Sequence, residues 1–484
     1  MENVLKGIQP EAVFRNFEAI SQIPRESGNE EQISNYLVQF GKDLGLEVIQ
    51  EESGNVIIKK PGTKGYENTP TVILQGHMDM VCVKKEGFEF VFAKDPIPLV
   101  VDGDFVKTKG TTLGADNGIA VAMSMAILES NDMEHPPLEC LITVEEETGM
   151  DGVMNLRPEH ISGKILINID SEEEGTMLAS CAGGVRNIVR IPIEWKEVSK
   201  GKQTYLLGVK GLRGGHSGSE IDKNRASAIK LLGRVLRTLQ QSIEFDIASV
   251  SGGEKMNAIP KMAYATLVID EGSKSKLEEI VSQYQDIFHK EFEVVDPEIQ
   301  VLVSKAEPAS RVFQKKTTEN FIHALRLIPY GVQTMSGNIQ GLVESSNNIG
   351  TLDTNENEIL LSSAVRSSVK SLKDEINDRI NSICELTDAK MELNSDYPAW
   401  EFEPNSKIRG IMNDVYQEMN HKEMKVDAIH AGLECGFLQE KLGKIDIVSI
   451  GPNIYNAHTP EESLSISSTQ RVYEFLVEVL KKIK

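Results

Sequence analysis

The sequence predicts an α/β protein in which a mostly parallel sheet forms one domain and a two-lobed α+β domain is inserted into it. Strands alternate with helices up to Asp170, and this order of elements builds parallel sheets. Near Arg186 the order gives way to a weak internal repeat that continues to about Leu393. We therefore predict a first domain made of 1–186 and 394–484, and an inserted domain made of 187–393.

Apolar spacing and turn residues place the elements of the first domain. Helices are predicted at 10–23 and 30–44, because apolar residues such as Val13 and Phe17 recur at helical spacing and Gly45 follows the second helix. Short strands are predicted at 47–50, 56–60, 71–75, 139–144 and 164–169, and a helix at 114–128. After the insertion come a helix at 408–419, a strand at 444–450 and a helix at 468–482, which would complete this domain.

The sequence of the insertion predicts two related copies of one set of helices and strands. The first contains a segment at 205–212, a helix at 225–240, a strand at 262–269 and a helix at 274–289. The second contains a segment at 299–305, a helix at 318–328, a strand at 359–365 and a helix at 371–386. Asn257 in the first copy corresponds to Asn348 in the second, so we predict two lobes of similar α+β structure.

Size and charge exclude some classes of protein. A chain of 484 residues is too long for one compact core, which predicts at least two domains. Its 73 acidic and 51 basic residues give a formal net charge of −22. A surface this acidic repels nucleic acids and anionic membranes, so we expect neither as a partner.

The cysteines and the apolar segments predict a cytoplasmic protein. The five cysteines are widely spaced and form no CxxC pair, which argues against a disulfide framework or a thiolate zinc site and favours a reducing compartment. The amino terminus lacks a signal-peptide pattern, and the longest apolar run, 118–128, is too short to span a bilayer.

An apolar run at 72–75 stops at Gly76-His77-Met78-Asp79, which reads as a buried strand ending in two reactive side chains. Ligands of open α/β sheets bind outside the carboxyl ends of the strands. His77 could bind a metal there, and Asp79, two residues on, could hold the His77 ring in position. Taken alone, however, His77 fits an ordinary hydrogen-bonded histidine better than a metal ligand.

Four further residues at predicted strand ends or in loops could join His77, and the five are His77, Asp116, Glu147, Asp170 and His458. Nitrogen and oxygen ligands without thiolates suit zinc or another first-row divalent ion. One zinc needs only three or four protein ligands, so five fit two metals that share a carboxylate. Asp116 is the predicted bridge, because its flanking glycines permit unusual backbone angles.

Each of these residues also has a structural interpretation. Asp116 could cap the helix that follows it, and Asp170 could belong to a solvated acidic turn. His458 could be an ordinary loop residue, and His430 competes with it as a ligand. Residue spacing alone leaves these alternatives open.

Glu146 and Glu147 form an adjacent pair of carboxylates at a strand end. A hydrolytic metal centre needs a base that takes a proton from water and returns it to the leaving group. One carboxylate could bind metal while its neighbour supplies this base. The alternative is an acidic boundary between a strand and a loop.

Four motifs stand in a characteristic order and spacing: Gly76-His77-Met78-Asp79, Leu113-Gly114-Ala115-Asp116-Asn117-Gly118, Glu146-Glu147-Thr148-Gly149 and Ile169-Asp170. In these motifs the chain resembles the di-zinc metallopeptidases that include carboxypeptidases, aminoacylases, tripeptidases and carnosinases. Gly214-Gly215-His216-Ser217-Gly218 and His430-Ala431-Gly432-Leu433-Glu434-Cys435-Gly436 look more specifically like the bacterial aminoacyl-histidine dipeptidases. Six such motifs in order make the resemblance strong.

The resemblance implies a role for each motif residue. His77 and Asp170 would bind one zinc, Glu147 and His458 the other, and Asp116 would bridge them, with cobalt or manganese as substitutes. Asp79 would orient His77, and Glu146 would be the general base. His216 would stabilise the oxyanion, Arg366 would bind the substrate carboxylate, and Asn257 and Gly432 would be lesser substrate contacts. The first domain would then be the catalytic domain and the insertion its lid.

The implied activity is the hydrolysis of dipeptides that have a free terminal carboxylate, Xaa-His and other unhindered dipeptides among them. An N-acyl-amino-acid deacylase or a tripeptidase on the same centre is the alternative, and a non-catalytic binding protein would have no need of a base beside a metal ligand. In one-lobed relatives the oxyanion histidine comes from a partner subunit. The doubled insertion suggests that His216 acts within its own chain, and a homodimer formed through the lid is compatible with this.

Overall fold

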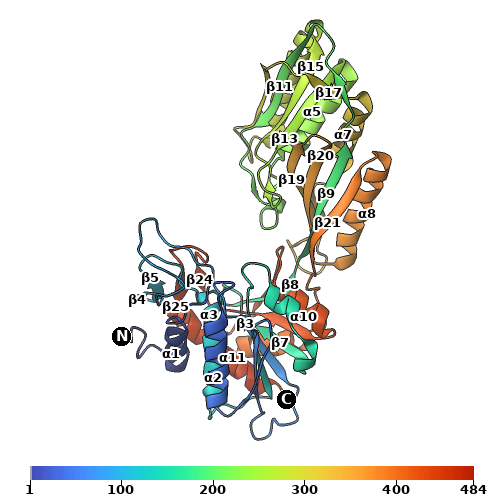
Figure 1. Cartoon of the computed structure of the whole chain (residues 1–484). Helices are drawn as coiled ribbons and strands as arrows, with labels where there is room; N and C mark the ends of the chain where they lie inside the picture. Colours follow the sequence, from blue (N-terminus) through green and yellow to red (C-terminus); the bar gives the residue numbers. More distant parts are fainter. Residues whose placement is uncertain (1–2) are drawn as a thin grey trace. The chain divides into compact units, whose positions relative to one another are not determined.

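The computed structural model describes residues 3–484 (Figure 1). The chain divides into two compact units. Unit 1 comprises the described residues up to Ser180 together with Phe402–Ala428 and Leu433–Lys484, coloured from blue to blue-green and from orange to red in Figure 1. Unit 2 comprises Cys181–Glu401 and Ile429–Gly432. The domain boundaries expected at 186/187 and 393/394 stay a prediction, and both fall inside strands of unit 2.

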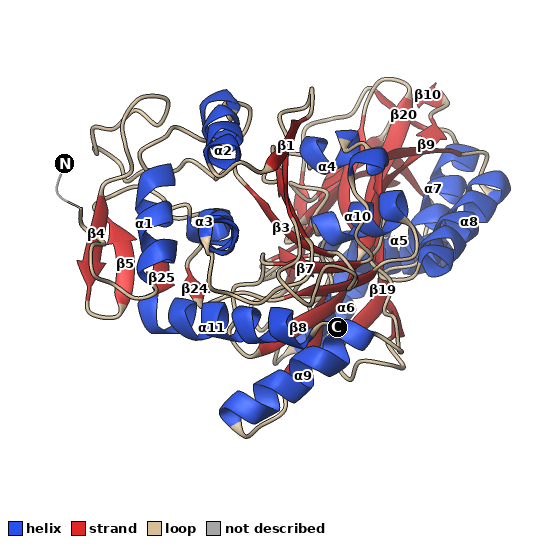
Figure 2. Cartoon of the chain, turned by 90° about the horizontal axis from the view of Figure 1, so that it is seen from below, coloured by secondary structure: helices blue, strands red, loops and turns tan. Residues whose placement is uncertain are grey.

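Unit 1 contains both helices and strands (Figure 2). Its helices are α1 (Glu11–Ile20), α2 (Glu31–Asp43), α3 (Ala115–Glu129), α4 (Asp151–Asn155), α9 (Lys407–Asn420), α10 (Glu434–Leu442) and α11 (Ile466–Lys482). Its main sheet contains β1 (Glu47–Gln50), β2 (Val56–Lys60), β3 (Val72–His77), β6 (Leu138–Thr143), β7 (Ile165–Asn168), β8 (Thr176–Cys181), β22 (Lys425–Ile429) and β23 (Asp446–Ser449). A smaller sheet contains β4 (Leu99–Asp102), β5 (Phe105–Thr108), β24 (Ile454–Tyr455) and β25 (Ser463–Ser465).

The main sheet has the strand order β1-β2-β6-β3-β7-β23-β8-β22. The four strands β6, β3, β7 and β23 pair in parallel, whereas β1, β2 and β8 pair antiparallel at the flanks. Every residue of β3 and of β6 is buried, as expected for parallel strands that are covered on both faces. Helix α3 packs on β3 and is buried over nearly its whole length, so it forms part of the core itself.

Unit 2 is a sheet with helices packed against it. Its helices are α5 (Ala228–Ser242), α6 (Lys274–Phe292), α7 (Lys315–Leu327) and α8 (Lys370–Leu386). The sheet contains β9 (Gly183–Pro192), β11 (Lys202–Lys210), β13 (Phe245–Gly252), β15 (Ala263–Asp270), β16 (Gln300–Lys305), β18 (Gly331–Met335), β19 (Val343–Thr354), β20 (Glu358–Ser367) and β21 (Lys390–Tyr397). The short strands β10 (Trp195–Glu197) and β17 (Arg311–Phe313) form one pair, and β12 (Gly215–His216) and β14 (Ala258–Ile259) form another.

The two predicted copies of the insertion share one continuous sheet, in the order β16-β11-β15-β13-β19-β20-β9-β21. The assignment of 299–305 to the second copy was wrong, because β16 pairs with β11 of the first copy at the edge of the sheet. One hydrophobic cluster extends from Val185 to Cys384 and packs the helices of both copies. Within residues 3–484, no helix is both long and apolar enough to cross a membrane.

Candidate metal centre and substrate-binding residues

The predicted metal ligands follow neighbouring strands at one edge of the main sheet of unit 1. His77 is the last residue of β3, and Glu147 and Asp170 follow the parallel neighbours β6 and β7. Parallel strands bring their carboxyl ends to the same edge, so residues far apart in sequence meet there. His77 lies directly beside Thr143, the last residue of β6.

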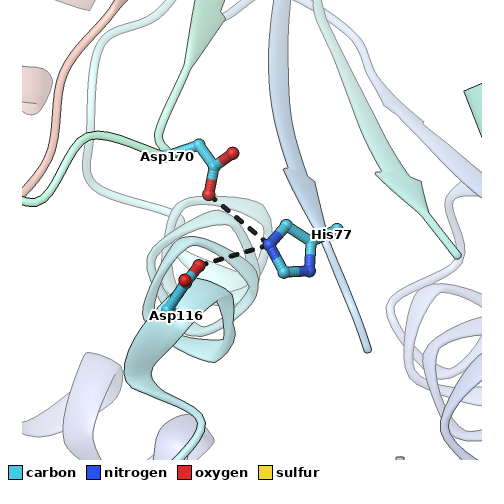
Figure 3. Close-up of side chains that lie close together, drawn as sticks. All are labelled: His77, Asp116 and Asp170. Atoms are coloured by element: carbon cyan, nitrogen blue, oxygen red, sulfur yellow. Dashed lines mark hydrogen bonds and ion pairs between the residues drawn. The ribbon is translucent and has the colours of Figure 1, made fainter. Parts of the chain in front are cut away.

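Figure 3 shows His77 with two carboxylates directed at one of its ring nitrogens. His77 Nε2 lies 3.3 Å from Asp116 Oδ1 and 3.5 Å from Asp170 Oδ1. The His77 side chain is 1% exposed, and that of Asp170 is 7% exposed. These three residues form a buried group that could hold a metal ion.

The second oxygen of Asp116 belongs to a neighbouring group. His458 Nε2 lies 3.0 Å from Asp116 Oδ2 and 2.9 Å from Glu147 Oε1. Asp116, Glu147 and His458 form a second group that could hold a metal ion. The Asp116 carboxylate therefore lies between two histidines, with one oxygen toward each.

The donor set fits bound cations. Asp79 Oδ1 lies 3.2 Å from His77 Nδ1, and a proton on this nitrogen would satisfy that contact. The Nε2 atom of His77 then carries a lone pair, yet it faces two carboxylate oxygens that also carry only lone pairs. Such a buried cluster of acceptors needs protons or metal ions between them.

Protons can occupy the same positions, because the neighbouring carboxylates raise the pKa values of both histidines. Burial lowers the pKa of His77, but Asp170 and Asp116 outweigh it, so that the pKa lies well above its usual value. Hydrogen bonds to Asp116 and Glu147 raise the pKa of His458 to about 11. A divalent cation would compete with these protons for the same nitrogens, so metal binding would release protons.

Asp116 lies in the first turn of α3, where its backbone angles are not helical. Two buried charged residues hold residues 113–116, which we call the Asp116 loop. The carboxylate of Glu462 accepts hydrogen bonds from the backbone N–H groups of 113–116 at 2.7–3.3 Å. Arg25 donates to the carbonyl oxygens of Met78, Asp79 and Gly114, and thereby joins the loop to the end of β3. Glu462 and Arg25 are each 2% exposed.

Asn117 links three of the segments that carry predicted ligands. Its Oδ1 accepts the backbone N–H of His77 at 3.2 Å, and its Nδ2 donates to the carbonyl of Ile169 at 2.7 Å. A side chain at position 76 would meet Asn117, since a Cβ added to Gly76 would lie 2.4 Å from Asn117 Oδ1. Gly76 is therefore needed for this close approach.

Asp79 also positions the acidic pair. Its Oδ1 accepts the backbone N–H of Glu146 at 3.1 Å, and its Oδ2 accepts that of Glu147 at 3.2 Å. Burial raises the pKa of Glu146 well above its usual value. A carboxylate with a raised pKa is a stronger base than an exposed one, which suits an acceptor of protons near neutral pH.

The four predicted substrate-binding residues, His216, Asn257, Arg366 and Gly432, all belong to unit 2. His216 lies on β12, and the carbonyl of Asn257 accepts the backbone N–H of Ser217 at 2.9 Å. Burial and the charge of Arg366 lower the pKa of His216, which favours the neutral ring.

Tyr397 lies between two of these residues. Arg366 donates from Nη1 to the Tyr397 hydroxyl at 2.9 Å. A Cβ added to Gly432 would lie 3.0 Å from the Tyr397 ring, so only glycine fits there without displacing that ring. Sequence reasoning missed Tyr397, because nothing in its local pattern indicates a contact 31 residues away.

His430, the competing ligand, lies in unit 2, and its Nε2 is 2.7 Å from Ser346 Oγ. Burial lowers the pKa of His430 to about 3. Among the described residues, the groups that could hold a metal include His458 and do not include His430. The geometry therefore favours His458 as the ligand.

Comparisons with known proteins agree with this architecture. The model of peptidase family M20/M25/M40 matches residues 73–482. The chain is 36% identical over 479 residues to the cytosol non-specific dipeptidase of Escherichia coli (strain K12), with 99% of each chain covered. A crystal structure of aminoacylhistidine dipeptidase from Vibrio alginolyticus is also 36% identical, with a TM-score of 0.96 over 99% of this chain and 98% of that one.

A more distant structure, aminopeptidase PepT from Bacillus cereus ATCC 10987, shares only the fold. It is 15% identical, with a TM-score of 0.57 over 98% of this chain and 99% of that one. The family model covers most of the chain, and the relative from Escherichia coli matches nearly all of it. The chain therefore belongs to peptidase family M20/M25/M40.

Proposed function

We propose that the chain is a metallo-dipeptidase that hydrolyses Xaa-His and other unhindered dipeptides at a centre of two zinc ions, for which Co²⁺ or Mn²⁺ can substitute. The position of the Asp116 carboxylate between His77 and His458 carries this proposal. In this proposal, His77 and Asp170 would hold one ion, Glu147 and His458 would hold the other, and Asp116 would bind both. The names of the relatives from Escherichia coli and Vibrio alginolyticus support a dipeptide substrate.

Glu146 is the proposed general base. When bound, the metal ions would polarise the scissile carbonyl and lower the pKa of a water molecule to about 7. Glu146 would take the proton of the attacking water and return it to the leaving amine. Asp79 supports this step indirectly, because it holds the His77 ring and the backbone of Glu146 at the same time.

Recognition of the substrate falls to unit 2 in this proposal. Arg366 would bind the terminal carboxylate, because a guanidinium stays charged and donates two parallel hydrogen bonds. Neutral His216 would donate to the oxyanion that forms when the peptide carbonyl is attacked. Asn257 and Gly432 would contact the substrate backbone. A cytoplasmic location, which the name of the relative from Escherichia coli supports, and a homodimer formed through the insertion complete the proposal.

Hydrolysis of a panel of substrates tests the activity. We expect the protein to cleave Xaa-His and other dipeptides, to act poorly on a tripeptide and an N-acetyl amino acid, and to lose activity in the presence of a chelator. Addition of Zn²⁺, Co²⁺ or Mn²⁺ should restore it. Activity that withstands the chelator would contradict the metal mechanism, and cleavage of the N-acetyl amino acid alone would contradict the choice of dipeptides.

The substitution Arg366→Lys tests the carboxylate site. Lysine keeps the charge but loses the fork of two donors, so we expect KM to rise about 10- to 100-fold, the equivalent of one or two charged hydrogen bonds. The value of kcat should change little. Steady-state kinetics with a dipeptide and with its carboxy-amidated form measure this effect.

The amidated substrate should already bind poorly to the unaltered protein, and Arg366→Lys should weaken it little further. Arg190→Lys is a matched control, since Arg190 lies on β9 of the same unit and pairs with Glu358 and Glu392 at its surface. An equal rise in KM with both substrates would mean that Arg366 does not bind the terminal carboxylate.

A further inference from the structure

Glu434 is a buried carboxylate whose hydrogen bonds reach the strands that carry the metal ligands. It lies in the first turn of α10 and is completely inaccessible to solvent. Its Oε2 accepts hydrogen bonds from Gln75 Nε2 at 2.6 Å and from Thr143 Oγ1 at 2.8 Å. One oxygen thus joins β3, which ends at His77, to β6, which precedes the Glu146–Glu147 pair.

The contacts of Glu434 continue to the third strand of the centre. Asn168 on β7 donates from Nδ2 to Gln75 Oε1 at 2.6 Å. Gln75 precedes His77 by two residues, and Asn168 precedes Asp170 by two. Side chains two apart along a strand point to the same face, so Gln75 lies directly behind His77 along β3. We call Glu434, Gln75, Thr143 and Asn168 the floor network.

The floor network is strictly internal, because its four members are at most 1% exposed. Among the described residues, no hydrogen-bond donor reaches Glu434 Oε1. Burial is the main cause that raises the pKa of Glu434 to about 7, and negative charge on Asp170 adds to the rise. Hydrogen bonds inside such a buried polar network are strong and rigidify the groups that they join.

We propose that Glu434 is a positioning residue that fixes the ends of β3, β6 and β7, and through them the relative positions of the metal ligands. The inference rests on the metal centre proposed above. Residues that hold metal ligands in place typically contribute 10- to 100-fold to metal affinity or activity. Glu434 would do so through Gln75 and Thr143, without touching substrate.

Two alternatives lead to different results. Glu434 could merely stabilise the fold, in which case any comparable buried glutamate would behave in the same way. It could instead hold the segment Ile429–Gly432, which precedes α10 in the chain and contains the proposed substrate contact Gly432. If substitution of Glu434 displaced that segment, KM would rise and metal affinity would stay unchanged.

The test compares Glu434→Ala, Glu434→Gln and Thr143→Val with Glu139→Ala as a matched control. Glu139 is 2% exposed, lies on β6 like Thr143, and accepts hydrogen bonds from Ser162 and Gly163. Affinity for Co²⁺ and Zn²⁺ is measured by competition with a chromogenic chelator, and the visible spectrum of the Co²⁺ form reports the geometry of the site. Thermal unfolding and steady-state kinetics are measured on the same samples.

We expect Glu434→Ala to weaken metal affinity about 10- to 100-fold and to alter the Co²⁺ spectrum. Glu434→Gln should stay close to the unaltered protein, because its amide oxygen can still accept from Gln75 and Thr143. Thr143→Val should weaken binding, and it should have no further effect when combined with Glu434→Ala. Glu139→Ala should lower thermal stability and leave metal affinity unchanged.

Three results would overturn the inference. Unchanged metal affinity in Glu434→Ala, with or without a rise in KM, would remove the positioning role. An equal loss in Glu139→Ala would reduce the effect to general destabilisation. An equal loss in Glu434→Gln would mean that the charge of Glu434 matters and its hydrogen bonds do not. If the unaltered protein keeps its activity in a chelator, the proposed function itself fails, and this outcome is separate from the other three.

Discussion

Replacement of Asp116 by alanine is expected to abolish dipeptide hydrolysis, with a loss of about 10³- to 10⁵-fold in kcat/KM. Asp116 directs one oxygen toward His77 and the other toward His458, so its removal takes a ligand from both proposed ions at once. Metal ions contribute several kcal/mol to the stabilisation of charge in such reactions, and each 1.4 kcal/mol corresponds to a factor of about ten. Steady-state kinetics and measured metal content report the effect.

Measured metal content distinguishes the proposed bridging role of Asp116 from the role of a residue that binds one ion, such as Asp170. Alanine at Asp116 should bring the content from two ions per chain to less than one, whereas alanine at Asp170 should reduce the occupancy of the His77 site first. Circular dichroism should show an unchanged fold, because Glu462 binds the backbone of this loop and not the Asp116 side chain. Retention of two ions by Asp116→Ala would contradict the bridging role.

The substitution Glu146→Gln is expected to lower kcat by about 10²- to 10⁴-fold, the usual contribution of a general acid–base residue. Glutamine has nearly the same shape but cannot accept the proton of the attacking water. The backbone of Glu146 stays held by Asp79, so the site should keep its geometry. The metal content and KM should therefore remain close to those of the unaltered protein, as metal analysis and steady-state kinetics will show.

Glu147→Gln provides the contrast, since the two residues are adjacent and Asp79 accepts the backbone N–H of each. Glu147 lies 2.9 Å from His458, so its substitution should cost metal affinity as well as rate. If Glu146→Gln lost metal and Glu147→Gln lost only rate, the two roles would have to be exchanged.

Local patterns were sufficient to predict much of the first unit. β1 and β2 have the predicted bounds, and the long amphipathic helices, such as α2 and α11, lie where apolar spacing placed them. These elements follow from side-chain periodicity, which acts over a few residues. Strands such as β19 and β21 were missed, because their many polar residues and long-range pairing leave little local signal.

The candidate site, too, could be predicted from the sequence only in part. The residues that end or follow strands β3, β6 and β7 indicate the chemistry of three candidate ligands and of the acidic pair. The residues that hold this site were not predicted: Glu462 reaches the Asp116 loop across 346 to 349 positions, and Glu434 reaches Gln75 across 359. A buried carboxylate in a helix or loop looks ordinary in a sequence until the fold brings its partners to it.

By itself, the sequence determined which side chains could bind metal and move protons, because these capacities reside in the residues and in the strands that end at them. The resemblance to the family already implied His458 over His430, and the tertiary structure adds contacts that favour the same choice, since spacing cannot measure distance across a sheet. It places His458 3.0 Å from Asp116 and His430 2.7 Å from Ser346. It also decided that one carboxylate lies between two histidines, because parallel strands bring distant residues to one edge.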